Sequence, residues 1–109
     1  MIIYNGKAVG VSFEPHKSNL MKAFNFLEEL GELCDPYIVL KHITDNKFDA
    51  NAVEILLCQD EIAWPVGWIP KNVNTEILSH GIDNCSAQLD QFTFNRDKVA
   101  GLHIIVEKI

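Results

Sequence analysis

The chain has 109 residues, with nine Lys or Arg against fifteen Asp or Glu, so its formal net charge is −6. This length suits one domain with one core, and it excludes a motor ATPase, a two-domain dehydrogenase or a full (β/α)₈ barrel. Hydrophobic residues make up 48% and charged residues 22%, an ordinary globular composition that argues against disorder. The acidic balance excludes a protein that coats DNA by bulk electrostatic attraction, because that mode needs many Lys and Arg.

Targeting signals are the next feature. No apolar run reaches the roughly 18 residues of a membrane span, and Met1–Lys7 does not read as a secretory signal. The three cysteines form no C-x-x-C pair, so neither a zinc ribbon nor a thioredoxin-type site is supported. We therefore expect a cytoplasmic protein with buried free thiols and no membrane partner.

The first predicted elements are a strand and a helix. Apolar residues alternate over Ala8–Glu14, as in a half-buried strand, and Pro15 ends it. Ser18 suits the N-cap of a helix that runs to about Leu30, and Gly31 suits its left-handed end. That helix carries an apolar stripe that can serve either the core or a partner subunit: Leu20, Met21, Phe24, Leu27 and Leu30.

Three strands are predicted in the middle of the chain. Tyr37–Ile43, Ala52–Cys58 and Ile62–Ile69 are rich in β-branched and aromatic residues. A tight hairpin turn is expected at Gln59–Glu61. Pro65 cannot donate to a strand ladder, so it marks an edge or a bulge.

A short helix and two more strands complete the chain. Asn72 or Asn74 can cap a helix that ends before Gly81. Cys85–Phe94 and Leu102–Glu107 then read as strands joined by a polar turn. The order β-α-β-β-β-α-β-β predicts one mainly β domain over residues 1–109, with two helices and a small curved antiparallel sheet or barrel.

Catalytic and metal motifs are the next question. The sequence has no G-x-S-x-G, no Walker A and no H-E-x-x-H. Its four His are dispersed and none has metal-ligand spacing. Because no nucleophile, base and orienting group can be named together, we predict that the protein is not an enzyme and has no metal or cofactor.

The most unusual segment is Asp45–Val53, a polar loop with one aromatic residue, Phe48, in its middle. The ring can fold inward onto the core, as most large aromatic side chains do. It can also present its face to a nucleobase, beside amide and carboxylate groups that bind a sugar or a base edge. The Asp and Asn residues of this loop favour turn formation over metal binding.

This loop resembles the signature of the HIRAN domain family. Asn46 to Val53 follow the family pattern of Asn, one residue, an aromatic, Asp, one residue, Asn-Ala and an aliphatic. Upstream, Val9–Phe13 resembles the family's first strand, a Val-Gly step followed by an aromatic. Downstream, Val66–Lys71 resembles its Val-Gly-aromatic-aliphatic-Pro motif. The resemblance extends over residues 8–108.

The resemblance implies a fold and a function. HIRAN domains are small β-barrels related to OB and SH3-like folds, attached to SWI/SNF-type helicases or found as stand-alone bacterial or phage proteins. This chain is similar to the stand-alone type. Well-understood members capture the 3′ end of single-stranded DNA in a pocket that recognises the free 3′-hydroxyl, which implies a nucleic-acid binding module in DNA repair or replication.

Roles for four residues follow from the resemblance. Phe13 and Phe48 correspond to the aromatic pair that holds the terminal bases. Asp49 corresponds to the acceptor of a hydrogen bond from the 3′-hydroxyl, a task that suits a carboxylate. Asn46 corresponds to the residue that shapes the loop.

Two further positions, and two departures, complete the comparison with the family pattern. Lys71 corresponds to a phosphate contact, and Trp68 either lines the groove or packs in the core. DNA-binding members have Arg at the position of Ser12 and an aromatic at that of Glu14, and neither residue here attracts a phosphate. A second function therefore stays open, a protein-interaction or self-assembling domain that retains the barrel and has lost DNA binding.

Overall fold

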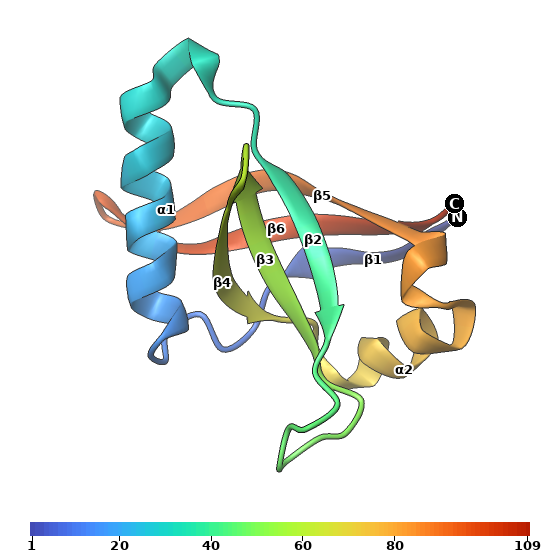
Figure 1. Ribbon diagram of the computed structural model, residues 1–109. Coiled ribbons are helices and arrows are strands. Elements are labelled where there is room, and N and C mark those ends of the chain that lie inside the picture. The colour runs from blue at the N-terminus through green and yellow to red at the C-terminus, as the bar shows by residue number, and fades with distance from the viewer.

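The computed structural model describes residues 1–109, which form six strands and two α-helices (Figure 1). Their order along the chain is β-α-β-β-β-α-β-β, with a short 3₁₀ turn after each helix. The strands make two three-stranded sheets in which every pairing is antiparallel. The predicted mainly β class with two helices is confirmed.

The first sheet joins the two ends of the chain. β1 (Ile2–Lys7) pairs with β6 (Lys98–Lys108), which pairs in turn with β5 (Cys85–Asn95). The Lys108 N–H donates to the Met1 carbonyl at 2.8 Å, and Figure 1 shows the two termini side by side. The β1–β6 pairing therefore links segments about as distant in sequence as the chain allows.

The second sheet comes from the middle of the chain. β2 (Tyr37–His42), β3 (Val53–Gln59) and β4 (Ile62–Trp68) pair in that order. In Figure 1 these three strands run steeply across the first sheet, so the two sheets cross one in front of the other. The loop between β2 and β3 projects at the bottom of the view, away from both sheets.

Several predicted breaks in the chain are confirmed. Asp60, with a φ of 54°, makes the tight turn between β3 and β4. The β3–β4 register shifts by one residue beside Pro65, which marks the bulge that this residue favours. Gly31 and Gly81, with φ of 56° and 90°, end the two helices where a left-handed residue is needed.

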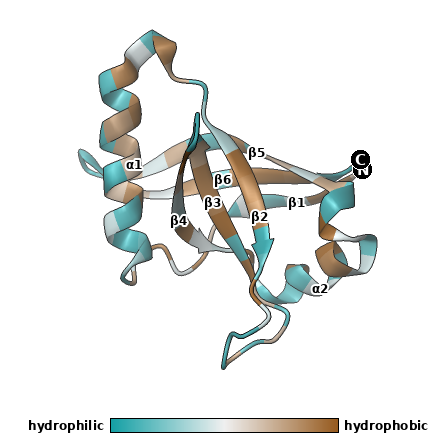
Figure 2. Cartoon of the chain, in the orientation of Figure 1, coloured by the Kyte–Doolittle hydropathy of each residue, from teal (hydrophilic) through white to brown (hydrophobic).

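Both helices contribute apolar side chains to one core. α1 (His16–Leu30) stands beside β4 at the left of Figure 1, and α2 (Lys71–His80) lies at the lower right. Figure 2 shows hydrophobic colour concentrated on the crossing strands and alternating around α1. Neither helix has the length and apolarity needed to cross a bilayer. The core takes only part of the stripe predicted on α1: Leu20 and Leu27 are core residues, Phe24 and Leu30 are half-buried, and Met21 is exposed. The core comprises Ala8, Leu20, Ala23, Leu27, Ile38, Val53, Ile55, Leu57, Val66, Ile69, Ile77, Leu102, Ile104 and Val106.

Strand pairing is continuous within each sheet but does not close into a barrel. β2 and β5 pack near each other, yet each is hydrogen-bonded to a strand on one side only. An isolated bridge between Val9 and Trp68 links the segment after β1 to the end of β4. The small OB/SH3-like barrel therefore stays a prediction.

The strand predicted at Ala8–Glu14 is wrong, because the first strand is β1 and that segment is a turn-rich loop. Gly10 has a φ of +73°, which an extended strand does not permit. A Cβ at Gly10 would lie 2.9 Å from Cδ1 of Trp68, so the indole occupies the space that glycine leaves. Close packing against Trp68 overrides the apolar alternation of this segment.

Both helices begin earlier than predicted. Pro15 and Pro70 occupy the N-cap positions, so neither Ser18 nor the two asparagines of α2 act as caps. The Glu14 carboxylate takes that part in α1 by accepting hydrogen bonds from the Ser18 N–H and hydroxyl. These bonds lower the pKa of Glu14, and the charge complements the helix N-terminus.

Candidate functional site

A groove of about 460 Å³ lies where the β2–β3 loop meets the end of β4 and the start of α2. We call it the Phe48 groove. Five of the six residues predicted to contact DNA line it, and Phe13 does not. Its lining is Val9, Asn46, Phe48, Asp49, Ala52, Trp68, Ile69, Lys71 and Asn74.

Side-chain hydrogen bonds fix the shape of the β2–β3 loop. Asn46 Oδ1 accepts from the backbone N–H of Phe48 at 2.8 Å and of Asp49 at 3.0 Å. This arrangement is an Asx turn, the local structure that Asn favours in loops. Nε2 of His42 donates to the Ala50 carbonyl at 2.8 Å. Asn46 therefore shapes the loop, as the family pattern implies for this position.

Phe48 lies in the middle of this hydrogen-bonded loop, and 93% of its surface is exposed. The inward-folded alternative for this ring is therefore wrong. The backbone around Phe48 is hydrogen-bonded, while its side chain is not part of the core. A large aromatic ring exposed on an ordered loop offers a face on which a planar group can stack.

Asp49 lies inside the groove as an ionised carboxylate held from two sides. Its Oδ1 accepts from the Asn51 N–H at 2.9 Å, and its Oδ2 accepts from Nδ2 of Asn74 at 2.8 Å. The Asn51 bond, followed by the Asn74 bond, lowers the pKa of Asp49, and Lys71 and His42 add to the effect. Each carboxylate oxygen has a second lone pair, so Asp49 can still accept a hydrogen bond from a ligand.

Asn74, which the sequence predicted as a possible helix cap, lines the groove instead. It is 2% exposed, and its Oδ1 is the one buried side-chain polar atom with no hydrogen-bond partner. The carboxylate of Asp49 can only accept, which fixes the amide nitrogen toward Asp49 and leaves the oxygen unpaired. An unpaired buried acceptor costs about 1–3 kcal/mol, so a donor that reached Oδ1 would be favoured.

Trp68 lines the groove, and its half-buried side chain is not part of the core. Its backbone N–H and carbonyl each bond to Val9 at 2.9 Å. Its ring meets the ring of His16 edge-on, with centroids 5.3 Å apart. His16 is itself held by a 2.8 Å contact between its Nε2 and Oε2 of Glu54. These contacts fix the position of Trp68 in the wall of the groove.

Lys71 gives the groove its cation. It is exposed at the first residue of α2, close enough to lower the pKa of Asp49. The positive end of the helix dipole lies at the same place. The groove thus has one carboxylate, one ammonium and one exposed ring within reach of a single ligand.

Phe13 is 72% exposed on the loop before α1, outside the lining of the groove. Its backbone N–H donates to Gly10 across a turn, and its carbonyl accepts from Lys17. The turn at Gly10 thus separates Phe13 from Val9, which does line the groove. The ring is free to contact a ligand that extends beyond the groove.

Reasoning from the sequence missed Val9, Ala52, Ile69 and Asn74 as lining residues. For Asn74 a signal existed. It lies three residues before the fully buried Ile77, on the inward face of α2, where a polar side chain needs a specific partner. No local pattern pointed to the other three, because Ala52 and Ile69 come together through the pairing of β3 with β4, and Val9 through its bridge to Trp68.

Comparisons of this chain with models of protein families, with curated proteins and with solved structures found no match.

Proposed function

We propose that this protein is a nucleic-acid binding module that recognises the 3′ end of single-stranded DNA in the Phe48 groove. The observation that carries the proposal is the convergence of an exposed ring, a carboxylate and an ammonium on one groove. The resemblance of the three sequence segments to HIRAN domains supports the same function, and an OB/SH3-like barrel is part of that proposal.

Each group has a task in this proposal. The terminal base stacks on Phe48, which contributes about 1–3 kcal/mol per base in comparable sites. The 3′-hydroxyl donates to Asp49, whose charged form is stabilised by Asn51 and Asn74. Lys71 meets the phosphate that precedes the terminal nucleotide. The braced Asx turn at Asn46 reduces the entropy that the loop loses on binding.

The net charge of −6 fits this mode of binding. A pocket that binds one strand end does so by base stacking and a few hydrogen bonds, and it needs to neutralise only few phosphates. Each neutralised phosphate on a single strand contributes a slope of about 0.7 in log K against log salt. Contact through Lys71 alone therefore predicts weak salt dependence.

The test compares an oligonucleotide ending in a 3′-hydroxyl with the same oligonucleotide ending in a 3′-phosphate, by fluorescence anisotropy. The proposal expects tighter binding of the 3′-hydroxyl strand, because a phosphate dianion beside Asp49 is repelled and offers no donor. Asp49→Asn should remove this preference, because the 3′-hydroxyl then loses its charged acceptor. Equal affinity for both ends in the unmodified protein would refute end recognition.

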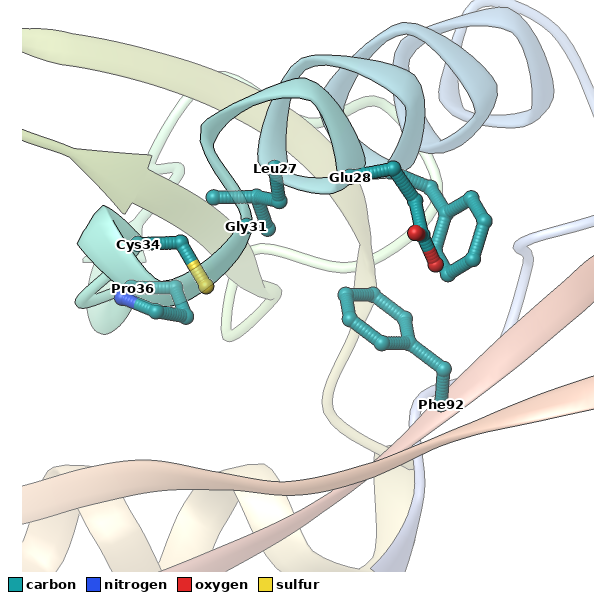
Figure 3. Close-up of a pocket in the computed structure, with 7 residues that line it drawn as sticks. Leu27, Glu28, Gly31, Cys34, Pro36 and Phe92 are labelled. Carbon is teal, nitrogen blue, oxygen red and sulfur yellow. The ribbon is translucent and has the colours of Figure 1, made fainter.

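A second candidate function is self-association, and one apolar groove favours it. A groove of about 200 Å³ lies between the end of α1 and β5, and its lining combines Phe24, Leu27 and Phe92 with Glu28, Gly31, Cys34 and Pro36 (Figure 3). We call it the Phe92 groove. The ring of Phe94 lies 5.5 Å from that of Phe24 and is 52% exposed, and Leu33 nearby in sequence is 80% exposed.

This patch gives a second copy of the chain an apolar surface to cover. Light scattering coupled to size exclusion, over a range of concentrations, tests it. Self-association predicts a mass that rises with concentration and returns to the monomer value in Leu33→Asp. A monomer at every concentration would exclude self-association through this patch.

A further inference from the structure

A second groove of about 440 Å³ lies between the first half of α1 and the β5–β6 hairpin. We call it the Lys17 groove. Its floor and walls include the buried Leu20 and the half-buried Val99. Its full lining is Val11, Ser12, Lys17, Leu20, Met21, Asn95, Lys98, Val99 and Ala100.

The polar groups of this groove can all donate to an anion. Lys17 and Lys98 are exposed, as are the Ser12 hydroxyl and the Asn95 amide. No Asp or Glu lines the groove, although the chain has fifteen acidic and nine basic residues. The Glu14 carboxylate beside the groove accepts hydrogen bonds from the N–H and hydroxyl of Ser18, and it keeps its negative charge near Lys17. The lining of the groove itself therefore carries two cations and no anion.

The apolar groups are as important as the lysines. A sugar–phosphate backbone alternates anionic phosphates with largely apolar sugar faces. Met21 and Val99 provide apolar contact in the same groove, above the buried Leu20. The combination of cations, neutral donors and aliphatic walls matches a phosphodiester chain better than it matches an isolated small anion.

The Lys17 groove adjoins the Phe48 groove through one short segment. Val9 lines the Phe48 groove, while Val11 and Ser12 line the Lys17 groove. Three peptide steps separate Val9 from Ser12, so their Cα atoms are at most about 11 Å apart. That is about three nucleotides of stacked single strand at 3.4 Å each. The exposed ring of Phe13 follows directly after Ser12.

We propose that the Lys17 groove binds the sugar–phosphate backbone of the same single strand, on the 5′ side of the nucleotide in the Phe48 groove. Lys17 and Lys98 neutralise two phosphates, and Phe13 stacks a base where the strand passes between the grooves. This inference rests on the proposed function and adds a second site to it. It also replaces the arginine expected at Ser12 by lysines from α1 and β6.

The test uses labelled dT₂ and dT₈ strands with a free 3′-hydroxyl, and dT₈ with a 3′-phosphate. The variant Lys17→Gln/Lys98→Gln is compared with the charge-matched control Lys41→Gln/Lys108→Gln, whose lysines are exposed and outside both grooves. Because all four lysines are exposed, thermal melts of both variants should match that of the parent protein.

For dT₈, the groove variant should reduce the slope of log K against log salt by about 1.4, twice the value of about 0.7 per phosphate. At 0.1 M salt this corresponds to an affinity loss of about 25-fold, because the electrostatic contribution vanishes near 1 M. Binding of dT₂, whose single phosphate lies at Lys71 in the proposed function, should change little. The control variant should leave the slope for dT₈ within error.

The outcomes separate the two proposals. Lysine-sensitive binding of both dT₈ strands without preference for the hydroxyl supports the Lys17 groove and refutes end recognition. Preference for the hydroxyl without lysine sensitivity supports the Phe48 groove and refutes the Lys17 groove. An equal change in the salt slope of dT₈ binding in the groove variant and in the control variant also refutes the Lys17 groove. If neither dT₈ strand binds, both proposals are wrong.

Discussion

The substitution Phe48→Ala separates ligand binding from folding more sharply than any other change in this chain. The ring is 93% exposed and absent from the core, so its loss should change the free energy of unfolding by no more than about 0.5 kcal/mol. Its stacking on a terminal base contributes about 1–3 kcal/mol. The affinity for a 3′-hydroxyl strand should therefore fall by about 5- to 150-fold.

Anisotropy titrations and urea denaturation on the same preparations measure both quantities. Phe94→Ala is the matched control, because it removes a partly exposed phenyl ring that lies outside the Phe48 groove. The control should leave affinity unchanged. The reasoning is refuted if Phe48→Ala binds as well as the parent protein, or if it unfolds at clearly lower urea concentration.

Three more predictions concern the walls of the groove and the acid limit of the fold. Asp49 and Glu14 have lowered pKa values in the folded state, so the stability that their charged forms contribute is present above about pH 4.5 and is lost as pH falls through the folded pKa values. Asp49→Asn and Glu14→Gln should each make the free energy of unfolding fall less steeply with decreasing pH in an acid titration. An acid titration that is the same as in the parent protein would contradict this prediction. Gly10→Ala should lower the free energy of unfolding by about 1–2 kcal/mol or more, because the φ of residue 10 is +73° and the new Cβ meets Trp68. Urea denaturation measures the change in stability, and the tryptophan emission spectrum reports the surroundings of Trp68. If both are unchanged, the close contact between Gly10 and Trp68 is refuted. Asn74→Asp should lower the free energy of unfolding by about 1–3 kcal/mol relative to the parent protein at neutral pH, because two carboxylates then meet, and this difference should shrink at pH 4. A difference from the parent protein that is equal at both pH values would show that the Asn74–Asp49 bond is absent.

Local rules predicted the elements whose partners are near in sequence. The hairpin of β3 and β4, the breaks at Gly31 and Gly81 and the bulge beside Pro65 follow from turn chemistry and proline geometry. The first strand could not be predicted in this way. β1 is stabilised by pairing with β6, whose residues are about a whole chain length away, whereas Ala8–Glu14 has the apolar alternation of a strand and is bent at Gly10.

In the candidate site, too, features set by residues near in sequence could be predicted, and contacts between distant segments could not. The Asx turn of Asn46 is a consequence of nearby residues and agrees with the turn formation predicted for this loop. The exposure of Phe48 was one of two alternatives that the sequence left open. The bond from Asn74 to Asp49 joins α2 to the β2–β3 loop, and the pairing of β3 with β4 brings these two segments together. Phe13 was grouped with Phe48 on the family pattern, and the turn at Gly10 separates them.

The most direct test of the central claim is the ratio of affinities for a 3′-hydroxyl and a 3′-phosphate strand of the same sequence. Asp49 is held ionised in the groove, with a free lone pair on each oxygen for a donor. A ratio well above one that falls to about one in Asp49→Asn is the expected result. A ratio of one in the unmodified protein, or binding to neither strand, would contradict recognition of a 3′ end.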